Sequence, residues 1–139
     1  MIIADTCLVF HLFNETDLTI SAQKVLYIEP HWIVPPLWRE EYANVLSKIA
    51  RKGHRSKTDV LTLFKNTLNE LSNCEIAIDT QTALEISLEY KISVYDAHFV
   101  ALAIEFNTLI VTEDKEVLKR CPDISINMSN FIKIKHPTI

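Results

Sequence analysis

Glycine is nearly absent from this chain of 139 residues, since Gly53 is the only one. Loops that cradle the phosphates of ATP, GTP or a dinucleotide depend on several glycines, because the backbone must come close to the phosphate. The sequence therefore disfavours nucleotide binding through such a loop. Gly53 itself follows a predicted helix, at a position where a left-handed cap favours glycine.

Motifs that bind zinc or form disulfide frameworks are also missing. The three cysteines, Cys7, Cys74 and Cys121, lack C-x-x-C spacing, and the five histidines show neither H-E-x-x-H nor H-x-x-E-H. We expect reduced thiols in a cytoplasmic protein. No apolar run reaches the ~18 residues of a membrane helix. The opening MIIADT has neither the basic stretch nor the cleavage site of a secretory signal.

Positive charge is in short supply, because 14 Lys and Arg face 18 Asp and Glu, for a net charge of −4. A protein that coats nucleic acid by neutralising phosphates is normally basic. The balance therefore disfavours a passive coat, but it permits a nuclease that uses a bound cation. Hydrophobic residues make up 48% of the chain, enough for the core of one domain, which we expect to span residues 1–139.

The order of apolar and amphipathic segments predicts alternating strands and helices. Short apolar runs predict strands at 1–4, 31–34, 75–78, 108–111 and 124–126. Amphipathic segments predict helices between these strands, whereas the tail from Met128 shows little pattern beyond Phe131 and Ile134. This order predicts an α/β fold, a three-layer α/β/α sandwich with a central, mostly parallel sheet of about five strands.

Four acidic residues stand at the borders of these elements: Asp5, Glu41, Asp96 and Asp114. Sites in open parallel sheets form beyond the carboxyl ends of the strands, and each of the four belongs to that edge. Gathered carboxylates repel one another unless a hard divalent cation lies between them. A cation held by carboxylates and water points to hydrolysis or transfer at phosphate.

Each acid also has a purely structural interpretation. Asp96 fits a capping box with Ser93, Asp114 fits a cap of the following helix, and Glu41 fits a charged helix surface. Asp5 is the hardest to explain in this way, because it ends an apolar first strand at a predicted cleft. Considered together with the topology, the four acids favour a shared site.

Three stretches of the chain carry a resemblance to PIN-domain ribonucleases. IIADTCLVFHLF resembles the opening of these proteins, WREEYANVLSKIA resembles their long helix, and VYDAHFVALAIEFNTLIVTEDKEVLK resembles their third and fourth motifs. The resemblance covers nearly the whole chain. Its length and motif order are similar to the VapC-like toxins of bacterial and archaeal toxin–antitoxin pairs. One departure is Glu113, an acid where small residues are common, although the spacing from Thr112 favours Asp114 as the site residue.

The resemblance implies an endoribonuclease that depends on Mg²⁺ or Mn²⁺. It implies that Asp5, Asp96 and Asp114 hold one or two cations, directly or through water. It implies that Glu41 completes a second cation position or orients the attacking water.

Supporting roles and partners follow from the same resemblance. Thr6 and Thr112 are expected to bind metal-bound water or a phosphate oxygen, and Asn44 to orient Glu41 by a hydrogen bond. The expected partners are RNA, a small antitoxin protein and a second copy of the chain in a homodimer. Three aromatic residues are candidates for that dimer interface: Trp38, Tyr42 and Phe64.

Two alternatives stay open. A non-catalytic PIN-like nucleic-acid-binding or scaffold domain would keep the fold without the chemistry, although none of the four acids is missing. The basic stretch from Lys48 to Lys57 either guides an RNA backbone or is a solvated helix end and turn. A haloacid-dehalogenase-type phosphatase is disfavoured, because it needs D-x-D after the first strand, where this chain has Asp5-Thr6-Cys7.

Overall fold

A small parallel sheet lies at the centre of the computed structural model, which describes residues 1–136. Its strands are β1 (Ile2–Ala4), β2 (Trp32–Ile33), β3 (Ile110–Val111) and β4 (Ser125–Ile126). Their order is β2-β1-β3-β4, and all neighbours run parallel. The chain leaves β1 toward β2 on one side and later returns to β3 on the other. The carboxyl ends of β1 and β3 therefore border the point where the winding direction reverses, the usual place for a site.

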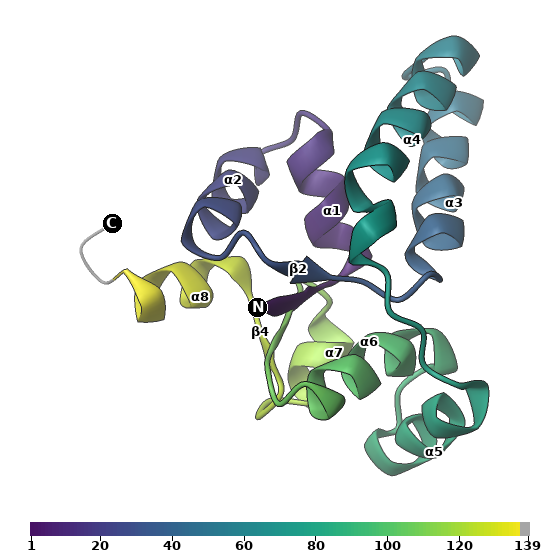
Figure 1. The fold of residues 1–139 in the computed structure, drawn as a ribbon. Helices are drawn as coiled ribbons and strands as arrows, with labels where there is room; N and C mark the ends of the chain where they lie inside the picture. Colours follow the sequence, from purple (N-terminus) through teal and green to yellow (C-terminus); the bar gives the residue numbers. More distant parts are fainter. Residues whose placement is uncertain (137–139) are drawn as a thin grey trace.

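Helices cover both faces of this sheet. They are α1 (Thr6–Phe13), α2 (Thr19–Ile28), α3 (Trp38–Arg51), α4 (Lys57–Leu71), the 3₁₀ turn η1 (Ser72–Cys74), α5 (Thr80–Tyr90), α6 (Val94–Glu105), α7 (Lys115–Arg120) and α8 (Met128–Lys135). Figure 1 shows α1 to α4 above the strands and α5 to α7 below them, with α3 and α4 forming a hairpin that extends beyond the sheet. This arrangement confirms the predicted three-layer α/β fold. Within residues 1–136, no helix combines the length and apolar character needed to cross a membrane.

The core forms where β1, β3 and α6 meet. Both strands are buried along their whole length. α6 buries Phe99, Val100 and Leu102 together with three alanines, so it is apolar around most of its circumference, as expected for a helix enclosed by its neighbours. This packing fixes the first turn of α6, which carries Asp96, against the carboxyl edge of the sheet.

The sheet has one strand fewer than predicted. The segment 75–78 makes only an isolated parallel bridge, between Glu75 and Val34. The Glu75 side chain instead accepts hydrogen bonds from Trp38 Nε1, at 3.0 Å, and from the Arg39 guanidinium. Side-chain contacts with the start of α3 thus replace a longer ladder, and they fix the first turn of that helix.

The tail after Met128 forms a helix that the sequence pattern did not predict. Asn127 caps α8, because its side chain accepts the Asn130 N–H at 2.8 Å. The helix buries Met128, Phe131 and Ile132, whereas Ile134 is 66% exposed. Residues 137–139 of the predicted domain lie outside the described part of the chain.

The aromatic cluster of Trp38, Tyr42 and Phe64 belongs to the interior. Trp38 and Tyr42 are fully buried, and Phe64 packs against both of them, at ring-centroid distances of 6.4 and 6.2 Å. The Tyr42 hydroxyl contacts the side chains of Asn14, at 3.2 Å, and Thr67, at 3.0 Å. The cluster therefore joins α3 to α1 and α4 within one chain. The prediction that Trp38 and Tyr42 supply a dimer interface is wrong.

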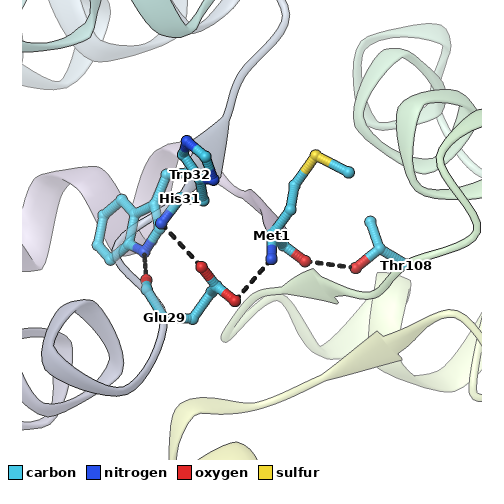
Figure 2. Close-up of polar contacts among 5 residues, drawn as sticks. All are labelled: Met1, Glu29, His31, Trp32 and Thr108. Carbon is cyan, nitrogen blue, oxygen red and sulfur yellow. Dashed lines mark hydrogen bonds and ion pairs between the residues drawn. The ribbon is translucent and has the colours of Figure 1, made fainter.

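Polar contacts hold the amino ends of the strands together at the edge opposite the acids. Figure 2 shows the Glu29 carboxylate between the Met1 amino group, at 2.6 Å, and the His31 N–H, at 2.9 Å. Trp32 Nε1 donates to the Glu29 carbonyl at 2.8 Å, and the Thr108 hydroxyl donates to the Met1 carbonyl at 2.7 Å. These contacts fix the register of β1 beside its neighbouring strands, and Asp5, which follows β1, therefore lies at the opposite edge of the sheet.

Candidate active site

Asp5 lies at the point where β1 passes into α1. Its N–H donates to the Val111 carbonyl at 3.2 Å, which extends the pairing of β1 with β3 by one step. One carboxylate oxygen caps α1 by accepting the Thr6 N–H at 2.9 Å. The other accepts the Thr112 hydroxyl at 2.5 Å. Asp5 is only 8% exposed, so two strands hold a nearly buried carboxylate in a fixed orientation.

Asp96 and Asp114 begin helices at the same edge. The Ser93 hydroxyl caps α6 by accepting the Asp96 N–H at 3.0 Å. Asp114 Oδ1 caps α7 by accepting the N–H groups of Glu116, at 2.8 Å, and Val117, at 3.0 Å. The Ser93 half of the capping box and the Asp114 cap therefore exist. They leave room for chemistry, because Asp114 Oδ2 makes no hydrogen bond with any residue of the described chain.

Glu41 reaches the site from the first turns of α3. Its Oε1 accepts the Thr6 hydroxyl at 2.7 Å, which links the start of α1 to α3. Asn44, predicted to orient Glu41, is exposed and makes no hydrogen bond with it among residues 1–136. Of the three supporting residues, Thr6 contacts Glu41 and Thr112 contacts Asp5, whereas Asn44 contacts neither acid.

One pocket of about 370 Å³ gathers all four acids. Its lining consists of Asp5, Thr6, Cys7, Phe10, Glu41, Val45, Asp96, Glu113 and Asp114, without a lysine or arginine. A larger hollow between α5 and α6 has two acids among mostly apolar residues and no comparable cluster. The carboxylates come from four separate elements, so the fold, and not sequence proximity, brings them together.

The charges in this pocket act on one another. Burial, with the charges of Asp5, Asp96 and Asp114, raises the pKa of Glu41 to about 7, against the hydrogen bond from Thr6. Burial, with the charges of Asp5 and Asp114, raises the pKa of Asp96 to about 6. Burial also raises the pKa of Asp5, against the hydrogen bonds from Thr112 and Thr6. A cation in the pocket would relieve this repulsion.

Cys7 and Glu113 complete the pocket wall, although the sequence suggested no site role for Cys7 and favoured Asp114 over Glu113. Glu113 Oε1 accepts the Met128 N–H at 2.8 Å, so this carboxylate binds the first turn of α8. The Glu113 N–H donates to Cys7 Sγ at 3.3 Å, and Cys7 Sγ donates to an Asp5 oxygen at 3.5 Å. Burial raises the pKa of the Cys7 thiol, which keeps it neutral. The only signal in the sequence is that these residues stand beside or near Asp5 and Asp114.

The donor set suits a hard divalent cation, since it consists of carboxylate and hydroxyl oxygens. Within residues 1–136, no group of three or more His, Cys, Asp or Glu side chains is arranged to hold a metal ion directly. Mg²⁺ is commonly bound by one or two carboxylates while it keeps several waters, a mode that needs no such convergence. The residues present thus fit a partly hydrated ion better than a closed cage of carboxylates.

Comparisons with known proteins agree with this architecture. The family model described as PIN domain matches residues 2–123, a range that includes all four acids. The crystal structure of PAE2754 from Pyrobaculum aerophilum is similar, with a TM-score of 0.70 over 98% of this chain and 96% of that one. The two sequences are 18% identical, so this likeness concerns the fold alone. No curated protein gives a significant sequence match.

Proposed function

We propose, from the premise that this chain belongs to the PIN-domain family, that it is an Mg²⁺- or Mn²⁺-dependent endoribonuclease. PIN domains are generally nucleases. The observation that carries the proposal is the pocket in which Asp5, Glu41, Asp96 and Asp114 meet without a lysine or arginine in its lining. Such a pocket repels a phosphate unless a cation lies between the carboxylates and the phosphate. With the cation bound, the pocket can bind the phosphate.

Asp5, Asp96 and Asp114 would hold the ion, directly or through water. A bound divalent cation supplies a more acidic water and offsets charge on the scissile phosphate. Thr112 keeps the Asp5 carboxylate in place through its 2.5 Å hydrogen bond. The capping bonds of Asp114 Oδ1 fix that side chain while Oδ2 stays available for a ligand.

Glu41 would orient the attacking water and accept its proton. In the metal-free pocket the pKa of Glu41 is raised to about 7, and a bound cation would lower it again, so that Glu41 would be ionised and able to accept a proton at neutral pH. Thr6 donates to Oε1, so the second oxygen is the one presented to the water. The hydrogen bond also limits rotation of the side chain, which lowers the entropy lost on reaching the reactive geometry.

Cleavage of single-stranded RNA by the purified chain tests the proposal. We expect cutting with Mg²⁺ or Mn²⁺, none with EDTA, and a loss of at least ~100-fold for Asp5→Asn and Asp96→Asn. Asp59→Asn is the matched control, because Asp59 stands three residues after the Ser56 cap of α4 just as Asp96 stands after Ser93. Equal cutting by Asp96→Asn and Asp59→Asn would refute the assignment.

A second candidate is a non-catalytic PIN-like domain that binds nucleic acid or serves as a scaffold. The observation in its favour is that, among the described residues, no three carboxylates are arranged to hold an ion. Calorimetric titration with Mn²⁺ separates the two candidates. Binding that Asp96→Asn weakens supports the nuclease, and no binding supports the scaffold.

The proposal includes the biological setting that the resemblance implies. The chain would act in the cytoplasm as the toxin of a toxin–antitoxin pair, as a homodimer neutralised by a small antitoxin. Its three free cysteines suit a reducing compartment. Growth arrest on expression, lost with Asp96→Asn, would support the toxin role. Light scattering of the pure protein would test the dimer.

A further inference from the structure

Positive charge is concentrated at the far end of the α3–α4 hairpin. Residues 42–58 contain no Asp or Glu, in a chain whose net charge is −4. They contain five of the 14 lysines and arginines, all exposed, which we call the hairpin cations: Lys48, Arg51, Lys52, Arg55 and Lys57. None of the five belongs to an ion pair within residues 1–136. Their charge is therefore available to a ligand.

Two of the hairpin cations, Lys48 and Lys52, continue the face of α3 that lines the acidic pocket. Glu41 and Val45 both line that pocket. At ~100° per residue, Lys48 and Lys52 lie within about 20° of Glu41 around the helix axis. With a rise of ~1.5 Å per residue, they lie about 10 and 16 Å from Glu41 along the axis. Figure 1 shows α3 leading from the sheet edge toward the outer end of the hairpin.

A polyanion that enters the acidic pocket needs a contact with positive charge outside the pocket. The pocket has five carboxylates in its lining and no lysine or arginine, so it cannot itself attract a phosphate backbone. Lysines neutralise phosphates and release counterions, and this release supplies much of the affinity of proteins for nucleic acids. Phosphates of one stacked strand are ~3.4 Å apart, so a line of about 16 Å matches about five of them.

We propose that Lys48 and Lys52, flanked by Arg51, Arg55 and Lys57, form a track for the phosphate backbone of the RNA whose scissile bond lies in the acidic pocket. The track rests on the proposed function for its ligand and gives that function a direction, along α3 from Glu41 to the hairpin tip. It would also explain why an acidic protein binds an acidic polymer, since the positive charge is local.

Salt-dependent RNA binding tests the track. A fluorescein-labelled oligouridylate is titrated with the double variant Lys48→Gln/Lys52→Gln in EDTA, so that no cleavage is needed. Lys24→Gln/Lys133→Gln is the control, because it removes the same charge from exposed positions on α2 and α8. All four side chains are exposed, and thermal melting of both double variants should match the wild type.

We expect the track variant to bind about 20-fold more weakly than the control at about 0.1 M KCl. The slope of log K against log[KCl] should shrink by about 1.4, because each lost contact with a single strand contributes ~0.7. Equal affinity and slope for the two double variants would overturn the track. If the track variant loses binding but the wild type never cuts RNA with Mg²⁺, the track stands and the nuclease proposal fails.

Discussion

Removing the charge of Glu41 should stabilise the metal-free protein. In Glu41→Gln the amide oxygen can still accept the Thr6 hydroxyl, which Oε1 accepts at 2.7 Å in the wild type. The variant loses the negative charge that burial and the neighbouring carboxylates of Asp5, Asp96 and Asp114 disfavour. A residue kept for catalysis often costs stability in this way, whereas a structural residue does not.

The size of the effect follows from the pKa of Glu41, which is raised from 4.5 to about 7. An acid with a raised pKa in the folded state contributes its full stability below about pH 4.5. That stability falls as the pH rises toward 7 and changes little above it. At ~1.36 kcal/mol per pKa unit the limit is about 3 kcal/mol. Glu41 is only partly buried, so screening by solvent and salt reduces the expected gain to about 1–2 kcal/mol at pH 8.

Thermal unfolding in EDTA at low ionic strength measures this gain. We expect Glu41→Gln to melt about 3–7 °C above the wild type at pH 8, with the difference vanishing near pH 4.5. Glu40→Gln is the control, because Glu40 is the exposed neighbour on the same helix and should change the stability by less than ~0.5 kcal/mol. A melting temperature for Glu41→Gln at or below the wild-type value at pH 8 would refute the reasoning.

Three further predictions concern the metal and the frame around it. Asp114→Asn should weaken Mn²⁺ binding, measured by calorimetry, about tenfold. Asp79→Asn is the control, because it changes an equivalent N-cap on α5 and should leave the affinity unchanged. Equal affinities of the two variants would argue against Asp114 as a ligand. Mg²⁺ at about 100 times its Kd should stabilise the fold by about 2.7 kcal/mol. Glu41 and Asp96, with pKa values of about 7 and 6, must lose their protons before the pocket binds the ion. The same gain in stability should therefore require less Mg²⁺ at pH 8 than at pH 6. A Mg²⁺ requirement that does not change with pH would contradict this prediction. Tyr42→Phe should lower the free energy of unfolding in urea by about 1–2 kcal/mol, since it removes the hydroxyl that contacts the buried side chains of Asn14 and Thr67. An unchanged urea midpoint would show that these side chains find other partners.

The layer order and the gathering of the acids followed from the sequence, because both depend on strong local signals. Short apolar runs placed β1 and β3, and parallel strands bring Asp5 and Thr112 to one edge. Ser93 was considered as the cap of the helix that carries Asp96, and the structure confirms this cap. The positive φ of Gly53, 77°, agrees with its predicted place after a helix.

The features that the sequence did not reveal depend on contacts between distant segments. The segment 75–78 looked like a strand, but Glu75 is held mainly through its side chain by Trp38 and Arg39. α8 is short and its apolar pattern is weak, so its position comes from packing of Phe131 and from its cap.

The same limit applies to the details of the site. The resemblance to PIN domains implied that Asn44 orients Glu41, yet Thr6, 35 positions away in sequence, donates the hydrogen bond. The spacing from Thr112 favoured Asp114 over Glu113 as the site residue, but the hydrogen bonds that hold these two acids could not be predicted. These bonds depend on α8, whose Met128 N–H donates to the Glu113 carboxylate, and on α7, which Asp114 caps.

The position of a bound ion decides whether the acidic pocket is a metal site. Crystals soaked in Mn²⁺ and measured at its absorption edge would show each ion by its anomalous scattering. We predict a peak in the pocket lined by Asp5, Asp96 and Asp114, within about 2.2 Å of at least one carboxylate oxygen, with waters completing the shell. A pocket without a peak at saturating Mn²⁺, or ions bound only elsewhere on the protein, would contradict the account.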